Sequence, residues 1–268
     1  MVHSGIKRIV PSAVRRFVRK HLIPKSAASI KHDKYDAELR YWKDQLAEMM
    51  LWYHGQKPDW YGLPAPLEKQ RQYVSDLEIV NAVITSHVLR PLYSRRLRLP
   101  LDHFARQRLL EIGSGPLVPI LQFTACERHA LDPLNDLYCA AGWPLYAYDA
   151  KMCNAYAEKM PYPDGYFDAA VSVNALDHVD NFQAVAAEIE RVLKPGGKIY
   201  FEVDYHEPTV TEPISLNDDI ILRAFQRCQL TKVAEAGKAD VYEATGTYNP
   251  SATNDDRLVL WHGKRNSS

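Results

Sequence analysis

The chain has 268 residues, of which 46% are hydrophobic and 25% charged, enough apolar material for the core of one large domain or of one domain with an appendage. No stretch approaches the roughly 20 apolar residues of a membrane-spanning helix, and the first residues lack the apolar core of a signal peptide. The four cysteines are scattered without metal-ligand spacing, so no structural zinc site is expected, and free thiols suit a reducing cytosol.

The formal net charge of zero hides a strong asymmetry at the N-terminal end. Residues 1–32 hold eight basic side chains and no acidic one, which leaves 25 basic and 33 acidic groups in the rest of the chain. A short helix is predicted within residues 6–24, from near Pro11, with one apolar and one basic side. This pattern indicates an arm on an anionic membrane surface, and the alternatives are an unstructured tail or a helix docked on the acidic body. Nucleic-acid binding is unlikely, since no other basic patch supports it.

Two helices are predicted next, in an extension over residues 33–100. The first spans 33–56, because apolar residues recur every three or four positions along it. A linker rich in proline and glycine follows, and a second helix is predicted over 67–89. Within the linker, Trp60 and Tyr61 are candidates for a lid over an acceptor.

From Arg108 onward, strand and helix patterns alternate. This alternation predicts an α/β fold, namely a doubly wound, mostly parallel seven-stranded sheet with helices on both faces, over residues 101–268. Ligands of such sheets bind at the carboxyl ends of the strands. The predicted strands are 109–112, 129–132, 146–148, 167–173, 198–203, 230–233 and 258–261, and the predicted helices are 117–126, 182–193 and 220–225.

The segment RLLEIGSGPLVP, residues 108–119, is a buried strand that ends in a glycine turn, where a ligand can approach the main chain. Further along stand LDP, MPYPDGYFDAAVSVNALDHV and EIERVLKPGGKIYFEV. Together, over about residues 105–205, these motifs resemble the class I S-adenosylmethionine-dependent methyltransferases. More narrowly, they resemble the branch with the pattern LPFPDGSFD followed by RVLKPGG. A nicotinamide-binding domain would need a third glycine where Val118 stands.

The resemblance implies S-adenosylmethionine as the methyl donor and assigns residues to it. Glu111, Gly113, Ser114 and Gly115 would line its methionine portion, and Asp132 would accept hydrogen bonds from both ribose hydroxyls. The alternative for Asp132 is a helix cap or a turn before Pro133.

Three further residues complete the expected donor site. Tyr156 and Ala157 replace the family's usual pair beside the adenine, where the expected acid is missing. Asn174, after the fourth strand, is also expected at the donor.

An acceptor hydroxyl would need a base, because a protonated alcohol is a poor nucleophile. His178, after the fourth strand, is the first candidate, and His206, after the fifth, is the second. The alternative for His178 is that it only closes the donor pocket. No metal site is expected, since the acidic runs 217–219 and 254–256 fit a helix start and a solvated loop.

The expected function is methyl transfer from S-adenosylmethionine to an acceptor. The arm, the loop aromatics and the histidines favour a hydroxyl of a lipid-linked or surface glycan sugar. The expected location is the cytoplasm, and the arm adds the option of a peripheral position at the inner face of a membrane. The alternatives are a small-molecule methyltransferase without a membrane link, or a non-catalytic protein that keeps the fold.

Overall fold

The computed structural model describes residues 27–60, 63–71, 73, 75–83, 92–245 and 252–267. The arm predicted over 6–24 therefore lies outside the described residues, as do Tyr61 and positions 84–89 at the end of the second predicted helix. Among the described residues, no helix is both long and apolar enough to cross a bilayer.

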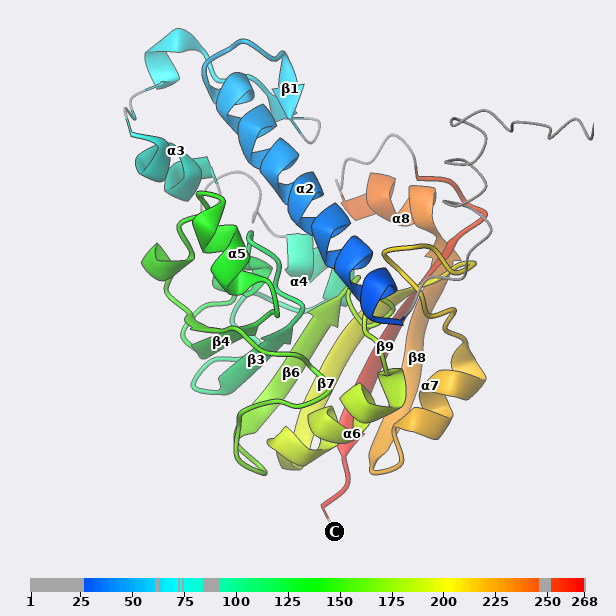
Figure 1. Ribbon diagram of the computed structural model, residues 1–268. Helices are drawn as coiled ribbons and strands as arrows, with labels where there is room; N and C mark the ends of the chain where they lie inside the picture. Colours follow the sequence, from blue (N-terminus) through cyan, green and yellow to red (C-terminus); the bar gives the residue numbers. More distant parts are fainter. Residues whose placement is uncertain are drawn as a thin grey trace, which may run out of the picture.

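A seven-stranded sheet forms the centre of the molecule, in the order β5-β4-β3-β6-β7-β9-β8 (Figure 1). Neighbouring strands from β5 to β7 pair in parallel, whereas β9 runs antiparallel to both β7 and β8. The α/β fold predicted from the alternation is therefore confirmed. The strands are β3 Arg108–Ile112, β4 Glu127–Leu131, β5 Lys151–Cys153, β6 Phe167–Val173, β7 Leu193–Tyr205, β8 Cys228–Gly237 and β9 Arg257–Arg265.

The sheet is buried on both faces, because successive residues of its central strands enter different cores. Leu109 and Ala169 belong to the core beneath the N-terminal helices, and their neighbours Leu110 and Ala170 belong to the core beneath α6 and α7. Each fully buried leucine contributes roughly 1.5–3 kcal/mol to folding. Helices therefore cover both faces, as the nearly continuous apolar runs predict.

The first described helix, α2 (Ala27–Tyr53), begins six residues before the predicted start and crosses the boundary expected at residue 32. Its predicted apolar stripe is turned inward: Met49 and Tyr53 are buried, and Tyr35, Trp42 and Leu46 pack against the same core. A small hairpin follows, with β1 Asp59–Trp60 and β2 Leu63–Pro64. The extension and the sheet thus share one hydrophobic core.

The second predicted helix, 67–89, is wrong in its first part. A single 3₁₀ turn (Glu68–Gln70) is followed by α3 (Asp76–Val83), and a separate α4 spans Leu92–Leu97. A capping box explains why α3 begins where it does. The Ser75 hydroxyl accepts from the Glu78 amide, and the Glu78 carboxylate accepts from the Ser75 amide at 3.1 Å.

Two further predictions are corrected near the first strands. The helix predicted over 117–126 is only a 3₁₀ helix, Pro119–Gln122, because Val118 and Ala125 adopt positive φ on either side of it. The strand predicted over 146–148 is also a 3₁₀ helix, Leu145–Ala147, which follows Pro144. The next strand of the sheet along the chain is instead β5, which begins at Lys151. An apolar run of three residues carries too little periodicity to separate the two states.

The remaining helices are α5 Asn135–Ala140, α6 Phe182–Val192, α7 Asp218–Ala224 and α8 Lys238–Thr245. Asparagine side chains start two of them: Asn181 accepts from the Ala184 amide, and Asn217 from the Ile220 amide. The acidic run at 217–219 is therefore a helix start, as predicted.

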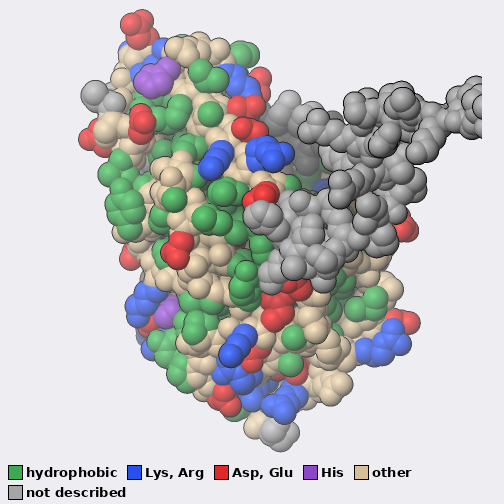
Figure 2. Space-filling view, viewed as in Figure 1, with side chains coloured by type: hydrophobic (Ala, Val, Ile, Leu, Met, Phe, Trp, Pro, Cys, Tyr) green, Lys and Arg blue, Asp and Glu red, His purple; other side chains and the backbone are tan. Residues whose placement is uncertain are grey.

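On the face drawn in Figure 2, described acidic and basic side chains are intermixed with hydrophobic ones.

Candidate active site

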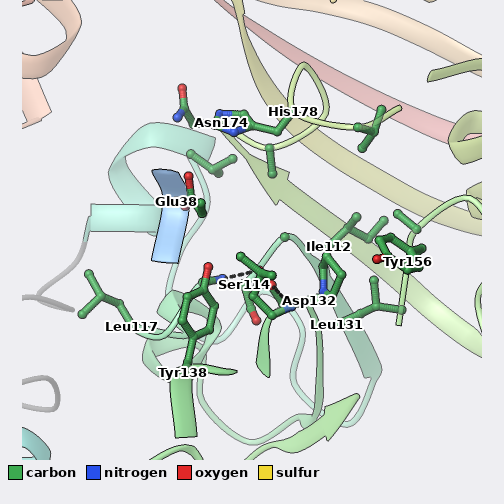
Figure 3. Close-up of a pocket in the computed structure, with 18 of the residues that line it drawn as sticks. Glu38, Ile112, Ser114, Leu117, Leu131, Asp132, Tyr138, Tyr156, Asn174 and His178 are labelled. Carbon is green, nitrogen blue, oxygen red and sulfur yellow. Dashed lines mark hydrogen bonds between the residues drawn. The ribbon is translucent and has the colours of Figure 1, made fainter. Parts of the chain in front are cut away.

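A cavity opens at the carboxyl ends of β3, β4 and β6, beneath α2 (Figure 3). It brings together most of the residues predicted to hold the donor. The predicted residues that line it are Gly113, Ser114, Gly115, Asp132, Tyr156, Ala157, Asn174 and His178. Glu111 and His206 are the two that do not line it.

The glycine loop needs glycine at position 113 for two separate reasons, its positive φ and the lack of space for a side chain. Gly113 has a φ of 70°, and a Cβ built there would lie 2.3 Å from the Cβ of Ala175. Gly115 has a φ of 53°, and its Cβ would lie 3.5 Å from the Trp42 ring of α2. The loop therefore packs closely between β6 and α2, and its backbone faces the cavity.

Asp132 follows β4 and is 7% exposed. Its Oδ2 accepts from the Gly115 amide at 3.0 Å and its Oδ1 from the Leu134 amide at 2.8 Å. Burial raises the pKa of this carboxyl group to about 6, Glu38 adds to the rise, and the two amides oppose it. Asp132 thus joins the glycine loop to the end of β4.

Several residues that line the cavity carry buried polar atoms without a hydrogen bond to any described residue, among them Ser114 and Asn174. Neither Ser114 Oγ nor Asn174 Oδ1 has a hydrogen-bond partner among the described residues. Asn174 also adopts a φ of 54°, which asparagine tolerates better than most residues. Because buried polar groups are usually paired, these atoms fit a polar ligand in the cavity.

Glu111 is fully buried behind the cavity wall. Burial raises the pKa of its carboxyl group well above the usual range, and the nearby Tyr93 hydroxyl opposes this rise. The predicted place of Glu111 along the wall of the ligand cavity is therefore not what the structure shows.

Helix α2 supplies a wall of the cavity that the sequence analysis missed. Lys34, Tyr35, Glu38 and Trp42 line it from above, and Tyr35 lies 6.0 Å from Tyr156 between ring centroids. The Trp42 indole donates to Glu38 at 2.7 Å. The spacing of Lys34, Glu38 and Trp42, four residues apart, was a visible signal that one helix side mixes charge with apolar surface.

The cavity also reaches α4, where Tyr93 and Arg96 line it. Arg96 is buried and pairs with Glu202 of β7, so its charge is compensated inside the protein. The hypothesis of a Trp60 lid is wrong, because Trp60 is buried against Trp52 and donates to Gln45 at 3.2 Å.

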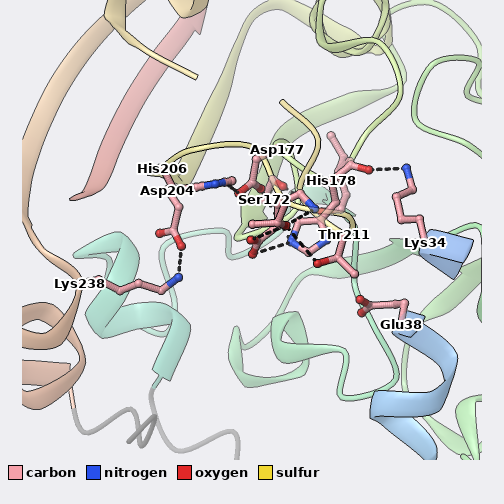
Figure 4. A network of polar contacts seen from close by, with 12 residues as sticks. Lys34, Glu38, Ser172, Asp177, His178, Asp204, His206, Thr211 and Lys238 are labelled. Carbon is pink, nitrogen blue, oxygen red and sulfur yellow. Dashed lines mark hydrogen bonds and ion pairs between the residues drawn. The ribbon is translucent and has the colours of Figure 1, made fainter. Parts of the chain in front are cut away.

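His178 lies at the rim of the cavity, in the loop after β6 (Figures 3 and 4). Its Nε2 is 3.6 Å from Glu212 Oε1 and 4.0 Å from Asp177 Oδ1. Its backbone carbonyl accepts from Lys34 Nζ at 2.7 Å, so α2 holds the loop that carries it.

His206 lies outside this cavity and lines a second pocket with Glu207, Ser215 and Lys238. Its Nε2 is 3.2 Å from Asp177 Oδ2, and this carboxylate raises the pKa of the imidazole to about 9. A histidine that stays protonated at neutral pH is a poor base, so the geometry and charge do not support the predicted base role of His206.

Comparison with known proteins agrees with this architecture. Residues 110–201 match the family model described as a methyltransferase domain. A sterol 24-C-methyltransferase of Gibberella zeae is 29% identical over 174 residues, which are 58% of this chain and 44% of that protein. A ubiquinone/menaquinone biosynthesis C-methyltransferase of Cupriavidus taiwanensis is 46% identical over 43 residues, 16% of this chain and 18% of that protein. The chain therefore spans less than half the length of these curated relatives.

Among solved structures, the YcgJ protein of Bacillus subtilis superimposes with a TM-score of 0.50 at 15% identity, covering 65% of this chain and 99% of that one. This similarity concerns the fold. The sheet order, and the glycine loop with an acid after the next strand, are those of an open α/β fold, whose ligands bind at the carboxyl ends of the strands. Residues 110–201 are thus similar to a methyltransferase domain, and the fold of the chain agrees with that similarity.

Proposed function

We propose that this chain binds S-adenosylmethionine in the cavity beneath α2 and transfers its methyl group to an acceptor that enters beside His178. The observation that carries the proposal is the convergence of Gly113, Gly115 and Asp132 with the unpaired polar atoms of Ser114 and Asn174 on one cavity. These residues come from three different strand ends, and ligands of open α/β sheets bind at such an edge.

Each wall of the cavity has a part in binding. Asp132 would accept from the ribose hydroxyls, and the Gly113–Gly115 backbone would lie against the methionine portion. Tyr156, Ala157 and Tyr35 form an apolar side suited to the adenine ring. Glu38 adds an acceptor from α2, which faces Asp132 across the cavity (Figure 3).

The bound sulfonium supplies an already activated methyl group. The protein's task is then to orient the acceptor and to exclude water, and a positioned pair can gain about 7–11 kcal/mol from proximity. Helix α2 serves the second purpose, since it covers the cavity with Tyr35 and Trp42. His178 is the imidazole on the acceptor side, and a base role for it remains our proposal for a hydroxyl acceptor.

The chemical class of the acceptor is a separate question from donor binding. The curated relatives named above are C-methyltransferases, and neither they nor the described residues support a sugar hydroxyl in particular. The membrane link rests on the basic arm alone. It predicts that removing residues 1–25 abolishes binding to vesicles of anionic phospholipid, and a full-length protein that ignores such vesicles would favour a small-molecule methyltransferase with the arm docked on its body.

Donor binding tests the central proposal. Calorimetry with S-adenosylmethionine is expected to show binding to the full chain, and Asp132→Asn is expected to weaken it about 10- to 100-fold, as for the loss of a charged hydrogen-bond partner. Asp149→Asn is the matched control, because Asp149 is exposed and pairs with Arg128 away from the cavity. No binding at millimolar donor would favour the non-catalytic alternative.

A further inference from the structure

Three metal-binding side chains meet beside the donor cavity. Asp177 and His178 follow β6, and Glu212 stands in the loop between β7 and α7. One ligand atom from each lies within 4.8 Å of the others. Figure 4 shows Asp177 and His178 in this network, with His206 on the far side of Asp177.

Burial distinguishes this cluster from an ordinary acidic surface. Asp177 is 0% exposed, and its Oδ1 has no hydrogen-bond partner among the described residues. His178 Nε2 is likewise buried and makes no hydrogen bond within the described part of the chain. Leaving such groups uncompensated costs free energy, whereas a cation between them would satisfy both.

The surrounding contacts also orient the ligands. His206 Nε2 lies 3.2 Å from Oδ2 of Asp177, on the oxygen that the cluster does not use. Outer partners of this kind fix the orientation of a ligating carboxylate. In addition, Thr209 donates to Glu212 Oε2 at 3.3 Å, which leaves Oε1 for the cluster.

We propose that Asp177, His178 and Glu212 bind one divalent cation, Mn²⁺ or Zn²⁺. Ligands of one ion lie at most about 4.2 Å apart, twice a bond of about 2.1 Å. The two distances from His178 Nε2, 3.6 Å to Glu212 and 4.0 Å to Asp177, fall within this limit. One imidazole with two carboxylates favours these ions over Mg²⁺ and Ca²⁺, which prefer oxygen ligands alone.

The position gives the ion a role at the acceptor side. Since His178 lines the donor cavity, the ion lies at its rim, where it can hold an oxygen atom of an acceptor. This role rests on the proposed function, but cation binding does not. A ligating His178 cannot also accept a proton at Nε2, so the ion and the base are alternative uses of one side chain.

Metal binding is measured on the full-length protein without donor, so that its failure is separate from a failure of the proposed function. After removal of metal with a chelator, the protein is titrated with Mn²⁺, and free Mn²⁺ is followed by electron paramagnetic resonance. We expect about one bound Mn²⁺ per chain. Zn²⁺ should displace this Mn²⁺, whereas Mg²⁺ at the same concentration should not. Asp177→Asn is expected to weaken binding more than tenfold, as is Glu212→Gln.

Glu207→Gln is the matched control, since Glu207 is an exposed acid that lines the second pocket beside His206. Its Mn²⁺ affinity should equal that of the unchanged protein. If Asp177→Asn fails to fold, Glu212→Gln decides alone, because Glu212 is partly exposed on a loop. The proposal is overturned if the unchanged protein binds neither ion at millimolar concentration, or if the folded variants bind Mn²⁺ as tightly as the control.

Discussion

At the scale of single residues, the site joins chemical and steric demands. Asp132 must be ionised to accept from a ribose diol, yet burial raises its pKa to about 6 from an ordinary value of 3.8. Gly113 is required for a steric reason, because a side chain at this position would collide with Ala175. Each of these residues gives a prediction.

Donor affinity should rise about tenfold between pH 5 and pH 7, because the ionised fraction of a group with a pKa of about 6 rises by that factor. Calorimetry at both pH values measures it. Asp132→Asn should lose this dependence while keeping the donor's own titration. The free energy of unfolding should fall as the pH rises from about 4 to about 6. In this window the folded protein still binds the Asp132 proton, whereas the unfolded chain has released it. Equal wild-type donor affinities at both pH values would refute the assignment of the ribose site.

Gly113→Ala should destabilise the protein more than Gly165→Ala. Both glycines have positive φ, 70° and 60°, so both variants incur a backbone cost of about 1–2 kcal/mol. Only the Gly113 variant adds a collision, at 2.3 Å from Ala175, whereas the nearest atom at Gly165 is 3.8 Å away. The extra loss in the free energy of unfolding, about 1–3 kcal/mol, is measured with denaturant. Equal losses would show that the loop simply moves aside.

At the scale of elements, α2 connects the extension to the chemistry. It packs its apolar stripe on the core and turns Lys34, Glu38 and Trp42 to the donor cavity. Lys34 is 4% exposed and donates to the His178 carbonyl at 2.7 Å and to Asp180 at 2.8 Å. The helix therefore holds the loop that carries both the candidate base and two of the candidate metal ligands.

Lys34→Met should weaken the binding of S-adenosylmethionine about tenfold. The substitution removes a buried, charged hydrogen-bonding group and so releases the loop after β6 from α2. Lys43→Met serves as control, since Lys43 is exposed on the same helix. Hydrogen exchange of the loop amides, measured together with donor affinity, should increase in the first variant only. If the two variants bind the donor equally well, α2 is only a scaffold.

At the scale of the whole molecule, the cavity is built from parts that are distant in the chain. Helices α2 and α4 share a core with β3, β6 and β7, and the cavity lies where they meet. A ligand bound there contacts elements from the extension and from the sheet. Donor binding should therefore stabilise the molecule as one unit.

At a donor concentration about 100 times its Kd, binding adds about 2.7 kcal/mol to the free energy of unfolding. For a chain of this size, the Tm should rise by roughly 5–10 °C. Thermal unfolding followed by circular dichroism measures the rise, and Asp132→Asn at the same donor concentration should show a smaller one. A Tm that does not respond to S-adenosylmethionine would contradict the proposed site.

The sequence by itself determined the α/β class and most strands, because buried strands form apolar runs that local spacing reveals. Its motifs also named the residues that meet at the donor cavity, since each directly follows a strand. Where φ turned positive, as at Val118, or where a run was as short as 146–148, local pattern could not separate a strand or a helix from a 3₁₀ turn.

Only the tertiary structure decided which residues face one another. It set α2 over the donor cavity and Trp60 in the core, and it moved His206 away from the cavity and onto Asp177. It also brought Glu212 to Asp177 and His178. The physical reason is that burial and pairing of charges depend on contacts between distant segments, and neither periodicity nor spacing along the chain encodes them.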